Sequence, residues 1–192
     1  QPDQIAAAVA ACAERFGTLD ILVNGAAGNF LAPAAALSPN GFRTVIEIDL
    51  VGTFNASKAA FDLLCKSGRG LILNISATLQ TRGTPLQAHA SAAKAGVDSL
   101  TRSLAVEWGR FGVRSVAIAP GPIGDTEGMR RLAPGDVGQR VMKQIPLGRF
   151  GTIQDVADLA VYLATDAAAY ITGAIIVVDG GHSVAGASPV QE

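Results

Sequence analysis

Hydrophobic and polar positions alternate along this chain in blocks of two kinds. Short apolar runs have the length of buried strands, and the longer stretches between them repeat apolar residues at helical spacing. The predicted strands are Leu19–Val23, Gly70–Ile75, Val113–Ala119 and Ala174–Val178. The predicted helices are Gln1–Phe16, Ser38–Lys66, Ala88–Gly109 and Ile153–Thr165. Apolar strands that alternate with helices predict an α/β fold with a doubly wound, Rossmann-like parallel sheet.

The stretch Ala88–Gly109 is the most informative of the helices. It consists mainly of small and apolar residues, so we expect it to be buried on more than one side. It also carries Lys94 and Asp98, four residues apart and therefore on one helix face, and Ala90 precedes the lysine by the same spacing. A buried lysine is costly unless another group pairs with it or uses it, so Lys94 is a candidate functional residue.

Composition limits the alternatives. The chain of 192 residues is 49% hydrophobic, which is enough for one core, and we predict a single domain over 1–184 with a loose tail over 185–192. Its net charge of −1 argues against nucleic acid, and no apolar run is long enough to span a membrane. Cys12 and Cys65 are far apart and are read as free thiols in a reducing compartment, so we predict no metal site and a cytoplasmic location.

Candidate binding residues follow the predicted strands. In a parallel sheet of this type, ligands bind beyond the carboxyl ends of the strands. Small or polar residues stand at three of these ends, in 24–28, 76–78 and 120–123. Small residues at a strand end are most often simple turn chemistry, but here they also allow the backbone to approach a ligand closely.

The order of these segments resembles the short-chain dehydrogenase/reductase superfamily. That family carries Asn, Ser, Tyr and Lys at its catalytic positions, and here Asp49, Ala77 and Ala90 replace the first three while Lys94 remains. Without a hydroxyl of lowered pKa at Ala90, ordinary ketone reduction is disfavoured. The glycine-rich dinucleotide fingerprint is not found in this sequence, so we expect a fold truncated at its N-terminus, without its first β-α units.

One branch matches these departures. The run from Asn24 to Phe30, Val97-Asp98, and the segment from Pro120 to Gly128 look like 2,4-dienoyl-CoA reductases, particularly the peroxisomal type. The resemblance implies NADPH-dependent reduction of a 2,4-dienoyl-CoA to the 3-enoyl-CoA, a step of fatty-acid metabolism. It also implies that Asp49 and Asp98 hold the water that supplies the proton, and that Lys94 binds the nicotinamide ribose. The simpler alternative for Asp98 is an ordinary ion pair with Lys94.

The resemblance assigns further residues. The positions matched to NADP(H) contacts are Asn24, Ala26, Lys94, Pro120, Gly121, Ile123 and Thr126. The positions matched to substrate contacts are Asn29, Phe30 and His89, the last with a structural role as its alternative. Arg82 is either a loop charge or a contact for the anionic CoA portion, and His182 is predicted to be a surface residue.

Two other functions stay open. The chain could be a reductase of the same fold that acts on another activated alkene or carbonyl, or a non-catalytic fragment of such a protein. We also predict a homo-oligomer, a homotetramer, because the helices 38–66 and 88–109 and the strand 174–178 show more apolar surface than one domain covers.

Overall fold

The computed structural model describes residues 1–133 and 135–186. Its centre is a four-stranded sheet in the order β1-β2-β3-β4, with every pair of neighbours parallel. The strands are β1 (Ile21–Asn24), β2 (Leu71–Ile75), β3 (Arg114–Pro120) and β4 (Ile175–Val178). Each lies within two residues of its predicted position, and the predicted parallel α/β architecture is confirmed.

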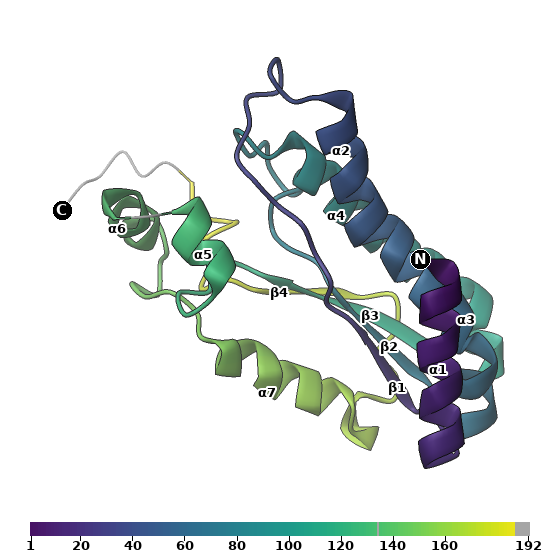
Figure 1. Cartoon of the computed structure of the whole chain (residues 1–192). Helices are drawn as coiled ribbons and strands as arrows, with labels where there is room; N and C mark the ends of the chain where they lie inside the picture. Colours follow the sequence, from purple (N-terminus) through teal and green to yellow (C-terminus); the bar gives the residue numbers. More distant parts are fainter. Residues whose placement is uncertain (134, 187–192) are drawn as a thin grey trace.

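Helices cover the two faces of the sheet (Figure 1). One face carries α1 (Pro2–Phe16), α3 (Gly52–Ser67) and α4 (Ala88–Trp108), and the other carries α7 (Ile153–Leu163). The remaining helices are α2 (Pro39–Ile46), which packs on α4, and α5 (Glu127–Leu132) and α6 (Asp136–Lys143), which lie beyond the carboxyl ends of the strands. Two short 3-10 turns, η2 (Gly109–Phe111) and η3 (Asp166–Ala168), follow α4 and α7.

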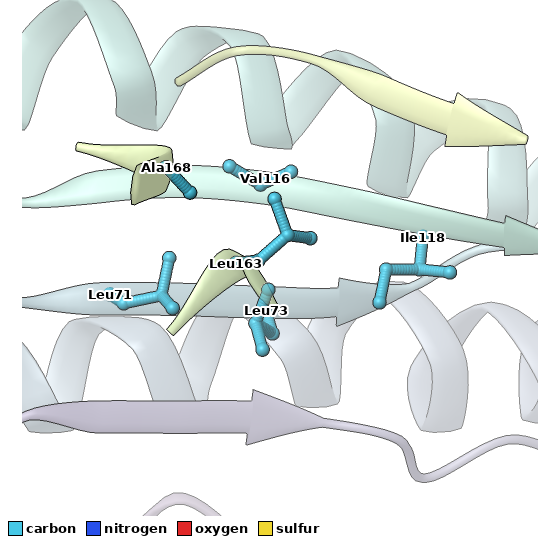
Figure 2. Close-up of a cluster of buried hydrophobic side chains, with 6 residues drawn as sticks. All are labelled: Leu71, Leu73, Val116, Ile118, Leu163 and Ala168. Carbon is cyan, nitrogen blue, oxygen red and sulfur yellow. The ribbon is translucent and has the colours of Figure 1, made fainter. Parts of the chain in front are cut away.

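The alternation of side chains along β2 explains why its whole run is apolar. Leu71 and Leu73 face α7, where they form a buried cluster with residues of β3, as Figure 2 shows. Ile72 points to the opposite face and packs with Leu64 of α3 and Leu104 of α4. A strand buried on both faces has no polar side to show in its sequence.

The predicted helix over 38–66 is the main correction to the sequence analysis. Its limits are nearly right, but a π-helical segment, η1 (Glu47–Val51), interrupts it between α2 and α3. The wider winding of η1 cannot be recognised in a hydrophobic pattern of ordinary helical spacing. Helices α5 and α6 were not predicted either, because their short sequences are mostly polar.

Local signals at helix ends were more reliable. Thr152 and Asp155 form a capping box at the start of α7, with each side chain bonded to the other's backbone N–H. Arg149 also donates to the Asp155 carboxylate, and these bonds hold the pKa of Asp155 well below its usual range. Of the predicted tail over 185–192, residues 187–192 lie outside the described part of the chain, and one domain over 1–184 stays a prediction.

Strand β1 forms one edge of the sheet. Ile21 and Val23 on this strand are 39% and 57% exposed. Such an edge, apolar and open along its backbone, is a site for pairing with another strand. Within residues 1–133 and 135–186, no helix combines the length and the apolar character of a membrane span.

Candidate active site

Lys94 lies at the centre of a buried polar cluster. Helix α4 carries it against the end of β2, where its Nζ donates to the carbonyl oxygen of Ile75 at 2.8 Å. The same nitrogen lies 3.4 Å from Oδ2 of Asp49, and both side chains are at least nine-tenths buried. An ammonium group has three donors, so one N–H of Lys94 stays available for a ligand.

Asp49 is positioned by the π-helical segment η1. Its side chain is 1% exposed, and Oδ1 accepts a hydrogen bond of 2.7 Å from the backbone N–H of Gly28, in the loop after β1. The hydroxyl of Thr53 donates to the backbone carbonyl of Asp49 at 2.6 Å, where the regular helical pattern is broken. A single π-helical turn within an α-helix is frequent at functional sites. Asp49 therefore links the loop after β1 to Lys94.

Asp98 has different partners from those predicted by its spacing. Its Oδ1 accepts a hydrogen bond of 2.5 Å from the hydroxyl of Ser76, just after β2, and its Oδ2 accepts from the amide of Gln80. Among the described residues, no ion pair joins Asp98 to Lys94, so the predicted alternative of a helical salt bridge is wrong. Asp98 is buried, with only 7% of its surface exposed, and it lies on the same face of α4 as the lysine.

The position expected for a catalytic tyrosine contains no hydroxyl group. Ala90 is 2% exposed and packs with Val45 of α2 and with Ala93. The small alanine side chain lets α2 approach α4 closely here. The polar cluster beside this position thus contains a lysine and two aspartates, but no tyrosine hydroxyl that could donate a proton.

The three predicted substrate contacts come together beside Ala90. The ring of Phe30 lies 4.3 Å from that of His89, centroid to centroid, and Asn29 donates to the side-chain oxygen of Gln87 at 2.6 Å. His89 is fully buried, and neither ring nitrogen has a hydrogen-bond partner in the described part of the chain. A buried donor without a partner is unfavourable, and the ring is enclosed, with Phe30 packed against it.

Asn24, predicted to contact a cofactor, has a structural role in the sheet. Its side-chain amide donates to Ser57 of α3 at 3.1 Å and to Asn74 of β2 at 2.8 Å. Asn74 in turn donates to the hydroxyl of Thr101 on α4 at 2.9 Å. This chain of bonds ties β1 and β2 to both helices beneath the site. A cofactor contact from Asn24 stays a prediction, as does that of Ala26.

The other predicted cofactor contacts follow β3. Gly121 lies so close to the end of β4 that an added Cβ would stand 2.5 Å from the Cβ of Asp179, so only glycine fits there. Ile123 pairs with Gly151 in an isolated parallel bridge, and Thr126 uses its hydroxyl to cap α5. Pro120 ends β3 at the same edge of the sheet. These residues line the strand ends as predicted, but the hydroxyl of Thr126 is already bonded.

Sequence reasoning missed two residues at the carboxyl edge of the sheet, Gln80 and Asp179. Gln80 stands in a loop without any motif, and only its contact with Asp98 reveals its position. Asp179 was missed as well, although it directly precedes the closing Gly180-Gly181. Burial acts against the charged form of Asp179, but bonds from Ser183 and Gly181 outweigh it and lower its pKa. In the described residues, no group of three or more metal-ligating side chains comes together.

A parallel sheet covered by helices on both faces places this chain among the Rossmann-like α/β proteins, and its polar cluster lies at the carboxyl ends of the strands, where such proteins bind ligands. The chain belongs within this class to the short-chain dehydrogenase/reductase family, because a family model described as enoyl-(acyl carrier protein) reductase matches residues 1–183.

Curated relatives are similar over most of this chain. A peroxisomal 2,4-dienoyl-CoA reductase of Danio rerio is 50% identical over 192 residues, which is 100% of this chain and 64% of the relative. A peroxisomal 2,4-dienoyl-CoA reductase of Saccharomyces cerevisiae is 48% identical over 93% of this chain and 61% of its own length. A probable 2,4-dienoyl-CoA reductase of Bacillus subtilis is 50% identical over 86% of this chain and 66% of its length. The chain thus spans about two thirds or less of these relatives.

Solved structures share the fold. A gluconate 5-dehydrogenase from Burkholderia cenocepacia, in complex with NADP and tartrate, aligns with a TM-score of 0.92 at 30% identity, over 97% of this chain and 73% of that one. A short-chain dehydrogenase from Bacillus anthracis aligns with a TM-score of 0.85 at 44% identity, over 95% of this chain and 71% of that one.

Proposed function

We propose that this chain carries the catalytic part of an NADPH-dependent reductase that converts 2,4-dienoyl-CoA to 3-enoyl-CoA. The observation that carries the proposal is the buried cluster of Lys94, Asp49 and Asp98 next to Ala90. A ketone reductase needs a hydroxyl acid at that point, whereas protonation of a carbon can use a water held by carboxylates. Relatives named 2,4-dienoyl-CoA reductases, similar over most of the chain, support the same reaction.

The proposed proton route uses the chain's own carboxylates. Asp49 and Asp98 each keep lone pairs for a water beyond the bonds they already accept. Ser76 and Gln80 hold the Asp98 carboxylate in one orientation, and Gly28 does the same for Asp49. We propose that, once hydride addition has left a dienolate on the thioester, a water held between the two carboxylates gives a proton to the α carbon, and that the hydroxide so formed regains a proton from solvent.

The residues present fit a nicotinamide dinucleotide in part. The free N–H of Lys94 suits a ribose hydroxyl, and the small residues after β1 and β3 let a ligand approach the backbone closely. When bound, NADPH supplies the hydride. The proposed contacts are the seven predicted positions, Asn24, Ala26, Lys94, Pro120, Gly121, Ile123 and Thr126.

We propose that Asn29, Phe30 and His89 contact the acyl thioester. Phe30 provides an apolar surface that is 41% exposed, and the unpartnered, fully buried imidazole of His89 lies against its ring.

We also propose a homotetramer, since Val106 on α4 and Val177 on β4 expose apolar side chains on two separate surfaces. A cytoplasmic location remains our proposal for the compartment. Relatives named peroxisomal point to the alternative, and fluorescence microscopy of the tagged product of the complete gene separates the two.

The substrate class is tested on the protein expressed from its complete gene. We expect NADPH oxidation with a 2,4-dienoyl-CoA, a 3-enoyl product by NMR, and little or no turnover of simple ketones or secondary alcohols. A short-chain ketone reductase that keeps its catalytic tyrosine is the matched positive control for the ketone assay. Rapid ketone reduction with inert dienoyl-CoA contradicts the proposal.

A further inference from the structure

Arg82 and His182 form a contact between two loops that are distant in sequence. Nη2 of Arg82 lies 3.0 Å from Nε2 and 3.4 Å from Nδ1 of His182. The arginine belongs to the loop after β2, and the histidine to the loop after β4, which are the strands on either side of β3. The pair therefore joins the loops that follow the two strands flanking β3, at the carboxyl edge of the sheet.

The bridge lies close to the proposed reaction site. Gln80, two residues before Arg82, donates to Asp98, and Asp179, three residues before His182, packs against Gly121. Both loops are thus fixed at one end by groups of the site.

The contact leaves positive charge without a negative partner. Among the ion pairs of residues 1–133 and 135–186, none includes Arg82, and its side chain is exposed. Its neighbour His182 is half-buried, and the carboxylate of Asp179 is already bonded to Gly181 and Ser183. A guanidinium beside an imidazole, with no carboxylate between them, is suited to a phosphate group.

We propose that Arg82 and His182 bind a phosphate of the nucleotide end of the CoA thioester. This inference rests on the proposed function for the choice of CoA, but the phosphate chemistry comes from the pair itself. Arg82 donates to the phosphate oxygens, and His182 adds a second donor when it takes up a proton.

The charges around His182 set the direction of the pH dependence. Burial lowers the pKa of His182, the positive charge of Arg82 lowers it further, and Asp179 acts in the opposite direction. The imidazole is therefore neutral near pH 7 in the free protein. A bound phosphate adds negative charge that favours the imidazolium, so binding takes up a proton and affinity rises as pH falls.

Calorimetric titration of the protein tests the pair directly. We expect Arg82→Gln to weaken binding of CoA about tenfold while pantetheine, which lacks the nucleotide, binds unchanged. Arg15→Gln removes the same charge from an exposed arginine near the opposite edge of the sheet and is the matched control. Equal losses in Arg82→Gln and Arg15→Gln overturn the proposal, because they reflect net charge alone.

Two further arms identify the phosphate and the histidine. Dephospho-CoA distinguishes the 3′-phosphate from the diphosphate, and a loss confined to NADPH overturns the proposal in favour of a cofactor phosphate. In buffers of different ionisation heat, the wild type takes up protons on binding CoA between about pH 8 and about pH 6.5, and His182→Gln does not. Equal uptake in both proteins also overturns it.

These readouts do not depend on turnover. If the enzyme is inactive with every dienoyl thioester but CoA binding depends on Arg82, the proposed function fails and the phosphate site stands. If a dienoyl-CoA is reduced and Arg82→Gln leaves its KM unchanged, the phosphate site fails and the function stands.

Discussion

Lys94 pairs with Asp49, which lies on a different helical segment, although Asp98 stands one turn away on its own helix. The lysine reaches across to η1, and Asp98 turns toward Ser76 at the end of β2. The site therefore contains a charged pair and a separate carboxylate that neutral groups hold. These two arrangements have different consequences when they are changed.

Asp49→Asn is expected to destabilise the protein by about 3 kcal/mol, since it leaves the buried charge of Lys94 without its counter-ion. Lys94→Met alone should also destabilise the protein, because it leaves the buried Asp49 carboxylate without its counter-ion. The double variant should lose less than the sum of the two single losses, because neither charge is then left alone. Urea unfolding of the four proteins measures this coupling, and strictly additive losses contradict the pairing.

Asp98→Ala is expected to lower kcat about 100-fold and to change KM much less, because the proposed role of the carboxylate belongs to the transition state. Asp158→Ala on α7, which removes an exposed carboxylate, is the matched control. Steady-state kinetics and melting temperature are measured on the same preparations. An Asp98→Ala enzyme that keeps most of its kcat shows that the proton-delivery assignment is wrong.

The stability of the protein should depend on His182 below neutral pH. Its lowered pKa means that the folded state binds its proton less tightly than the unfolded chain, whose histidine pKa is about 6.5. The free energy of unfolding therefore falls as pH decreases through this region. Between about pH 7.5 and about pH 5, the wild type should lose more stability in urea than His182→Gln. A larger loss in the variant contradicts the sign of this effect.

Val106→Glu should weaken the proposed assembly. The valine side chain is 84% exposed on α4, so a charge there costs the folded monomer about 0.5 kcal/mol or less but disfavours an apolar contact between copies. Light scattering is expected to show a smaller species for the variant than for the wild type. A wild-type protein that is monomeric at micromolar concentration argues against the homotetramer itself.

Much of the fold could be predicted because its signals are local. The apolar run that became β2 and the helical spacing that became α7 depend on neighbours in sequence, and both were recognised. Helix α6 could not be predicted, because its sequence is mostly polar. Its position depends on a tertiary contact, the close approach of Gly138 to Phe150.

The site was predictable in composition but not in contacts. The spacing of Lys94 and Asp98 placed both on one face of α4, as the structure has them. The spacing could not show that Lys94 contacts Ile75 and Asp49 rather than Asp98. Those contacts depend on how η1 packs against α4. The role of Gln80 likewise arises only from tertiary structure.

The π-helical segment η1 also affects the directions in which the side chains before and after it point. Val45, Asp49, Thr53 and Ser57 are all buried at intervals of four residues. In a regular α-helix three such steps rotate the stripe by about 120°, and one end would turn toward solvent. The wider winding of η1 reduces this drift, and all four side chains stay buried, Val45 against α4 and Ser57 against Asn24 of β1. It follows that the number of residues in 47–51, and not only their identity, determines which side chain meets Lys94.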